Sequence, residues 1–196
     1  QEQIFAPLGM VDTGFFVPPE QASRLAANYV ASDGGGIRVM DDPTTSTYLR
    51  EPTFHCGCGG LVSTAGDYLR FSRMLLNGGS LEGARILGHK TLELMAQNHI
   101  EGGRSIYEAS ASGIWQASYA GSGFGLGFAV YLDGARSQLS GSPGEFNWSG
   151  AAGTHFWIDP AEQLAAVLMI QYMSMSVETR YNLHRELRAI VYGALD

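Results

Sequence analysis

Between Gly144 and Pro160 the sequence reads GEFNWSGAAGTHFWIDP, and this stretch decides the fold. The part that follows Trp148 consists of small residues as far as position 153, whereas residues 154–158 are aromatic and β-branched, a composition typical of strands. After a short polar link, residues 164–170 form a second apolar run of strand length. Two such runs joined by a short link predict an antiparallel hairpin within a sheet.

The small residues at positions 149–153 allow two interpretations. Glycine in a strand lets another group approach the backbone closely, and N–H groups beside it can hold a carbonyl oxygen, which is the geometry of an oxyanion hole. The same spacing also fits a bulge or close packing against a helix. The residues alone favour the packing interpretation, so an oxyanion hole needs independent support.

The composition is that of a globular protein and excludes several classes. Of the 196 residues 45% are hydrophobic and 16% are charged, which is too apolar for a disordered chain. The net charge of −7 argues against a nucleic-acid partner. No apolar run reaches the roughly 18 residues that a membrane-spanning helix needs. The length suits one domain with a sizeable core, or part of a larger domain.

The N-terminus reads as the continuation of a longer chain. The sequence begins with Gln1 rather than Met, and no signal peptide is recognisable. Residues 1–8 resemble the end of a helix, because no capping residue precedes them. We therefore expect the natural chain to begin further upstream, which leaves the cellular compartment undetermined.

The two cysteines, Cys56 and Cys58, lie close together in the run His-Cys-Gly-Cys that starts at His55. A bridge between them would close a very small, strained ring. A metal site would need further ligands and a different spacing. We therefore expect a glycine-rich turn that carries two small apolar thiols.

Two helices are predicted with some detail. Thr64 is expected to cap the first, with Asp67 completing a capping box, and Asn77-Gly78-Gly79 to end it. Capping also explains the hydroxyls of Ser63 and Thr64 better than nucleophilic chemistry, since no His or Lys has a spacing that would activate them. The second helix spans residues 176–195 and is amphipathic. Its expected apolar face consists of Leu183, Leu187, Ile190, Val191 and Leu195, with the charged residues, Arg188 included, mostly off that face.

The remaining elements are less sharply defined. Residues 124–132 predict one strand, because every even position is apolar. Residues 26–31 and 37–40 suggest a small peripheral hairpin, and residues 90–96 a short helix. The stretch 101–123 is rich in Gly, Ser and Ala with scattered aromatic residues, so it either lines a pocket or forms a surface excursion.

Taken in order, several motifs resemble the C-terminal portion of the serine β-lactamase superfamily. This family includes class C β-lactamases, low-molecular-weight penicillin-binding proteins and family VIII carboxylesterases. The resemblance covers nearly the whole chain and is specific for the superfamily rather than for a substrate. The motifs are Leu-Gly-Met-x-Asp-Thr at 8–13, Gly-Gly-Leu-Val-Ser-Thr-Ala-Gly-Asp-Tyr-Leu-Arg-Phe at 59–71, Leu-Leu-Asn-Gly-Gly at 75–79, Gly-Leu-Gly-Phe at 125–128, and Trp-Ser-Gly at 148–150 before Phe-Trp-Ile-Asp-Pro at 156–160.

The resemblance implies an α+β fold, an antiparallel sheet with helices packed on its faces. It also implies that residues 1–196 are an incomplete domain, without the N-terminal strands and the catalytic helical region. Members of the family transfer acyl groups through a Ser-x-x-Lys motif and a second Tyr or Ser motif. A Ser-x-x-Lys motif is absent, because Lys90 is the only lysine and Leu87 stands three residues before it. A Tyr-x-Asn motif is absent as well, because none of the nine tyrosines is followed two residues later by asparagine. We expect this chain alone to be inactive and the missing N-terminal portion to be its partner.

The third motif of the family is present in the form that resembles the esterases, as Trp148-Ser149-Gly150. By the same correspondence, the backbone N–H of Ala151 is one oxyanion donor. Strand alternation would place Ala151 and His155 on the same face, so His155 is expected to help shape the substrate pocket, although not as a general base. Substrate-binding residues are therefore expected at Trp148, Ser149, Gly150 and His155.

The function implied is a serine hydrolase that acts on carboxylic esters by acyl-enzyme chemistry, with no cofactor or metal. Trp148 replaces the lysine that can hold the carboxylate of a β-lactam, and an indole offers apolar area and one N–H donor. This favours a neutral small-molecule ester over a β-lactam-like substrate. The alternatives are a β-lactamase or D,D-peptidase of the same superfamily, and a ligand-binding remnant without catalysis.

Overall fold

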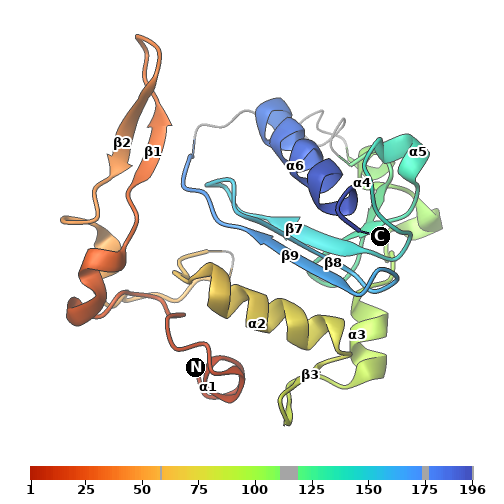
Figure 1. The fold of residues 1–196 in the computed structure, drawn as a ribbon, viewed down its shortest axis with the longest axis horizontal. Coiled ribbons are helices and arrows are strands. Elements are labelled where there is room, and N and C mark those ends of the chain that lie inside the picture. Colours follow the sequence, from red (N-terminus) through yellow and green to blue (C-terminus); the bar gives the residue numbers. More distant parts are fainter. Residues whose placement is uncertain (58, 111–118, 174–176, 196) are drawn as a thin grey trace.

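The computed structural model describes residues 1–57, 59–110, 119–173 and 177–195, and its main body is a five-stranded antiparallel sheet between helices (Figure 1). The α+β fold inferred from the sequence is confirmed. The strands follow one another in the order β5 (Ser122–Phe124), β6 (Ala129–Tyr131), β7 (Phe146–Ser149), β8 (His155–Asp159) and β9 (Leu164–Leu168).

Helices lie on both faces of this sheet. Helix α2 (Ala65–Leu76) packs against β8 and β9 on one face, and α6 (Val177–Tyr192) lies on the other (Figure 1). The smaller elements are α1 (Phe5–Leu8), η1 (Pro19–Arg24), β1 (Asn28–Ala31), β2 (Ile37–Asp41), η2 (Thr47–Leu49), β3 (Ser80–Leu81), β4 (Ala84–Arg85), α3 (His89–Met95), η3 (Glu101–Gly103), α4 (Ile106–Ala109) and α5 (Gly134–Ser137). Within the described residues, no helix is long and apolar enough to cross a bilayer.

The hairpin predicted from the runs at 154–158 and 164–170 is confirmed as β8 and β9. Its register runs from His155 opposite Leu168 to Asp159 opposite Leu164, and every residue of β8 is buried. The Asp159 carboxylate closes the turn by accepting hydrogen bonds from the backbone N–H groups of Ala161 and Glu162, at 3.0 and 3.2 Å. Buried apolar side chains on the α2 side of the sheet form the main core.

The single strand predicted for residues 124–132 is wrong. The chain turns between β5 and β6, and the N–H of Gly125 donates to the carbonyl of Phe128 at 2.8 Å. Gly125 lies so close to the carbonyl oxygen of Met95 that a Cβ atom would overlap it. The alternating apolar pattern was misleading because the glycines at 125 and 127 let the backbone fold back on itself.

The N-terminal end of α2 confirms one half of the predicted capping box. The Thr64 hydroxyl accepts from the N–H of Asp67 at 3.2 Å. The Asp67 carboxylate does not return to Thr64. It is buried and accepts from the N–H of Asp12 and the hydroxyl of Thr13, both at 2.8 Å. Asp67 therefore attaches the N-terminal segment to α2, a contact across more than fifty residues that the sequence did not reveal.

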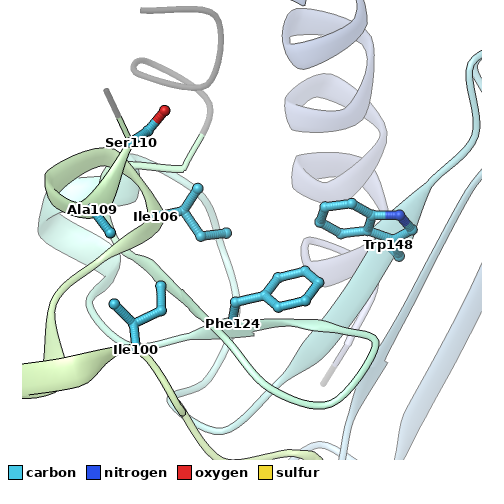
Figure 2. A pocket seen from close by; sticks show the side chains of 6 residues that line it. All are labelled: Ile100, Ile106, Ala109, Ser110, Phe124 and Trp148. Atoms are coloured by element: carbon cyan, nitrogen blue, oxygen red, sulfur yellow. The ribbon is translucent and has the colours of Figure 1, made fainter. Parts of the chain in front are cut away.

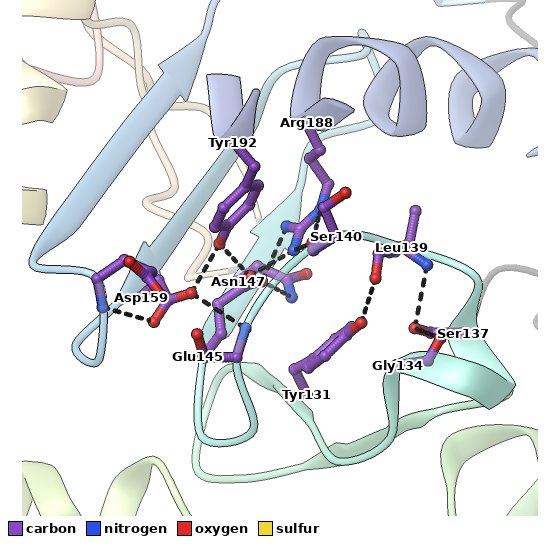
Figure 3. A network of polar contacts seen from close by, with 12 residues as sticks. Tyr131, Gly134, Ser137, Leu139, Ser140, Glu145, Asn147, Asp159, Arg188 and Tyr192 are labelled. Atoms are coloured by element: carbon purple, nitrogen blue, oxygen red, sulfur yellow. Dashed lines mark hydrogen bonds and ion pairs between the residues drawn. The ribbon is translucent and has the colours of Figure 1, made fainter. Parts of the chain in front are cut away.

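Helix α6 buries a charged side chain, Arg188, that was expected to lie off its apolar face. Ile190, assigned to the apolar face, is 71% exposed, whereas Arg188 is buried. The Arg188 guanidinium forms an ion pair with both oxygens of the buried Glu145 carboxylate, one at 2.8 Å (Figure 3). It also lies over the Trp157 ring, 5.2 Å from the centroid. Leu183, Leu187 and Val191 of the expected apolar face are partly buried, so the expectation is wrong for Ile190, for the exposed Leu195 and for Arg188. A charged residue can face inward when a buried partner of opposite charge is present.

The hairpin expected near the N-terminus forms as β1 and β2, and it projects from the body of the molecule (Figure 1). Tyr29 connects it to the segment after β9, because its N–H donates to Gln171 at 3.1 Å and its carbonyl accepts from Met173 at 2.8 Å. The expectation of a free thiol at Cys56 is wrong, since this cysteine is disulfide-bonded. The other cysteine of the sequence, at position 58, lies outside the described residues.

Candidate active-site wall

The third motif begins at the end of β7, where neighbouring side chains point to opposite faces of the sheet. Trp148 lies on the α2 side and packs against Phe124, with ring centroids 5.1 Å apart, and near Tyr119 at 6.0 Å. Ser149 lies on the α6 side, opposite His155 of β8. Two adjacent residues of the motif therefore contact different surroundings.

Gly150 and Ala151 belong to the tight turn between β7 and β8. The N–H of Gly150 donates to the Thr154 carbonyl at 2.8 Å, and a Cβ at this position would overlap the Thr154 hydroxyl. Only glycine fits there without displacing that side chain. Ala151 is exposed, and the carbonyl of Ala152 accepts from the N–H of Tyr172 at 2.9 Å.

The geometric relation expected between Ala151 and His155 is wrong. Strand alternation assumed that both residues lie on one continuous strand, but the chain reverses direction between them. Ala151 sits at the tip of the turn, whereas His155 pairs with Ser149 at the base of the turn. The assignment of Ala151 as an oxyanion donor does not depend on that alternation and stays a prediction.

An apolar pocket lies beside Trp148 (Figure 2). Its volume is about 290 Å³, and its lining contains one hydroxyl and no charged side chain. The lining residues are Ile100, Ile106, Ala109, Ser110, Phe124 and Trp148. Of the two interpretations of residues 101–123, pocket lining is confirmed for Ile106, Ala109 and Ser110, while residues 111–118 lie outside the described residues.

The short helix α4 carries part of this pocket and is fixed at its start. The Ser105 hydroxyl accepts from the N–H of Glu108 at 3.2 Å, and the Glu108 carboxylate accepts from the N–H of Ser105 at 2.8 Å. Arg136 also binds Glu108 at 2.6 Å and, with Ser105, lowers the pKa of that carboxyl to about 2. The Ser-x-x-Glu spacing was the signal that could have predicted α4.

His155 lies on the α6 side of β8 and is not among the residues that line the pocket. Its Nδ1 is 2.9 Å from the Ser149 hydroxyl, and its ring stacks on His184 of α6, with centroids 4.0 Å apart and planes inclined by 14°. Burial lowers the pKa of His155 well below its ordinary value, and electrostatic interactions with His184 and Arg188 lower it further. The imidazole is therefore neutral at pH 7.

The chain is similar to known proteins of one family. The family model described as beta-lactamase matches residues 1–189. The chain belongs to the beta-lactamase family. A curated relative, Protein Rv1367c of Mycobacterium tuberculosis, is 35% identical over 176 residues, which is 87% of this chain and 42% of the relative. The chain thus spans somewhat less than half the length of this relative, as the resemblance to a C-terminal portion of the family implied.

Two solved structures share the fold. The LovD6 mutant of simvastatin synthase from Aspergillus terreus is 25% identical with a TM-score of 0.79, and 98% of this chain covers 48% of that one. EstCE1, described as a hydrolase with promiscuous acyltransferase activity, is 24% identical with a TM-score of 0.75, and 98% of this chain covers 49% of it. The superfamily inferred from the sequence motifs is confirmed by the family model, and these solved structures show that the fold is shared.

Proposed function

We propose that the protein to which this chain belongs is a serine hydrolase that cleaves neutral carboxylic esters through an acyl-enzyme. In this proposal residues 1–196 form one wall of the active site, and the Ser-x-x-Lys nucleophile lies elsewhere in the protein. The observation that carries the proposal is the environment of Trp148, which closes an apolar pocket without a charged lining. An apolar pocket favours an uncharged acyl or alcohol group, because burying an unpaired carboxylate is costly.

Trp148 and Gly150 of the third motif, and Ala151 directly after it, each have a role in this proposal. Trp148, with Phe124 and Ile106 opposite, contacts the apolar part of the ester. Gly150 permits the tight turn, and the N–H of Ala151 at its tip donates to the carbonyl oxygen as negative charge develops there. Removing one such donor typically lowers kcat by about 10²–10³-fold.

The runner-up is a β-lactamase or D,D-peptidase of the same family. Their substrates carry a carboxylate, which needs a cation or several hydrogen-bond donors. The described lining of the pocket offers the Ser110 hydroxyl and the Trp148 indole N–H, but no cation. This difference makes the ester the better-supported substrate.

The test compares p-nitrophenyl butyrate with nitrocefin as substrates of the full-length protein. We expect ester hydrolysis to exceed nitrocefin hydrolysis in kcat/KM by at least about 100-fold, equivalent to about 2.7 kcal/mol of transition-state binding. Trp148→Lys should lower ester kcat/KM, whereas the matched variant Trp148→Phe should retain most of it. Faster turnover of nitrocefin than of the ester would establish the runner-up instead.

A second measurement tests whether catalysis needs the rest of the protein. A fluorophosphonate should label the full-length protein stoichiometrically and leave the 196-residue chain unlabelled. Labelling of neither species, together with no ester turnover, would favour the ligand-binding remnant. Labelling of the 196-residue chain would refute the assignment of the nucleophile to another part of the protein.

A further inference from the structure

We infer that Ser149 and His155 are positioning residues, whose hydrogen bond fixes the β7–β8 turn and thereby the N–H of Ala151. The catalytic consequence rests on the proposed function. The mechanical part, that this side-chain pair holds the turn in one position, stands on the structure alone and is tested separately below.

The pair closes the hairpin at the point where the turn begins. Ser149 and His155 are the last cross-strand partners of β7 and β8, and their side chains are joined at 2.9 Å. Beyond them, the N–H of Gly150 donates to Thr154 at 2.8 Å and that of Gly153 donates to Gly150 at 3.0 Å. Because the turn is this short, a change in the Ser149–His155 separation moves its tip directly.

The His155 ring is held rigidly on the side away from the pocket. It stacks on His184 at 4.0 Å and lies 5.6 Å from the Trp157 ring, and it is buried. The rotation that would break the hydrogen bond to Ser149 therefore requires displacement of α6. His155 thus transmits the position of α6 to the turn, rather than acting on substrate itself.

The same two side chains form a serine and histidine pair at the distance of a nucleophile and its base. The surroundings argue for positioning instead. The pocket residue Trp148 lies on the opposite face of the sheet from Ser149 and His155. The imidazole is buried, and the His184 and Trp157 rings lie beside it with centroids 4.0 and 5.6 Å away, which leaves a substrate carbonyl no room. A nucleophilic role for Ser149 is an outcome that the experiment distinguishes.

The experiment uses the full-length protein with Ser149→Ala and His155→Phe, which remove one partner each, and Ser149→Thr, which keeps the hydroxyl. Amide hydrogen exchange of residues 150–153 is measured by mass spectrometry. The values of kcat and KM are measured with p-nitrophenyl butyrate as the substrate. We expect exchange at the turn to accelerate about fivefold in the first two variants, the factor that one net hydrogen bond supplies. Their kcat should fall about tenfold or more while KM stays within twofold, because the pocket is unchanged.

Ser149→Thr should keep exchange slow and retain most of kcat. Ser32→Ala in the distant β1–β2 turn is the matched serine control, and it should leave exchange at residues 150–153 unchanged. Unchanged exchange at residues 150–153 in both Ser149→Ala and His155→Phe overturns the inference, as does faster exchange with an unaltered kcat. Fluorophosphonate labelling at Ser149 also overturns it, in favour of a nucleophile. Absence of ester turnover in the wild type refutes the proposed function, while the exchange measurement still decides whether the pair holds the turn.

Discussion

Replacement of Arg188 by methionine tests whether the buried ion pair holds α6 on the sheet. Arg188 and Glu145 are both buried, and the guanidinium contacts both carboxylate oxygens and the Ser140 carbonyl (Figure 3). Methionine retains apolar volume and adapts to irregular spaces, so the variant removes charge and hydrogen bonds while it leaves little cavity. Glu145 keeps two neutral donors, the Tyr192 hydroxyl at 2.9 Å and the Asn147 amide at 3.3 Å.

The expected magnitude follows from the charge left behind. Removing one partner of a buried ion pair typically lowers the free energy of unfolding by about 3–5 kcal/mol. The two remaining donors to Glu145 contribute about 1 kcal/mol each, so the lower part of that range is expected. Adding Glu145→Leu removes the uncompensated charge, and the double variant should regain at least half of the loss.

The pH dependence supplies an independent check. Burial raises the pKa of Glu145, and in the wild type the Arg188 guanidinium counteracts this rise. In Arg188→Met that counteraction is gone, so the folded-state pKa lies further above the unfolded value of about 4.3. A raised folded-state pKa favours folding at low pH, and this contribution is lost as pH increases through the folded value. The deficit of the variant should therefore shrink as pH falls from 7 toward 4.

The assay is urea unfolding followed by far-UV circular dichroism. The free energies of unfolding of wild type and variants are compared where their m-values, the slopes against urea concentration, are equal. Glu145→Leu alone should also destabilise, because it leaves Arg188 buried without its partner. A loss below about 1 kcal/mol for Arg188→Met, or no recovery in the double variant, would contradict the reasoning, since both follow from a fully buried and mutually compensated pair.

Three further predictions concern stability. Asp67→Ala should lower the free energy of unfolding by about 2 kcal/mol, because the Asp12 N–H and the Thr13 hydroxyl lose a buried acceptor; faster amide exchange at Asp12 would identify the cause. Gly125→Ala should cost about 3 kcal/mol, because its Cβ would overlap the Met95 carbonyl, whereas Gly34→Ala has open space and should change thermal stability little. The pKa of the buried His155 is depressed, so its contribution to the free energy of unfolding is fully present above about pH 6.5 and is lost as pH falls. His155→Phe should therefore remove this part of the loss of stability in acid.

Each of these predictions has an outcome that contradicts it. Equal melting temperatures of Gly125→Ala and Gly34→Ala would show that the β5–β6 turn tolerates a side chain. Unaltered exchange at Asp12 in Asp67→Ala would show that the N-terminal segment is held by other contacts. Parallel pH–stability curves for the wild type and His155→Phe between pH 4 and 7 would show that His155 is not kept neutral by folding.

Local sequence signals determined a substantial part of this structure. The aromatic and β-branched run at 154–158 with its apolar successor predicted β8 and β9, and Thr64 with Asn77-Gly78-Gly79 predicted the ends of α2. These elements depend on neighbours within a few residues, such as a cap, a turn or a periodic pattern. The order of the motifs also identified the family that the comparison with known proteins confirms.

The tertiary structure decided what depends on residues distant in the sequence. Arg188 faces inward because Glu145, 43 residues earlier, supplies a buried countercharge, and the strand predicted at 124–132 breaks because Gly125 lies against the Met95 carbonyl. The placement of Trp148 and His155 on opposite faces likewise requires the turn at 150–153 and the stacking of α6. A local pattern determines where a helix or strand forms, but the direction of a polar side chain depends on desolvation and on the partner that compensates for it, and only the folded chain brings that partner near.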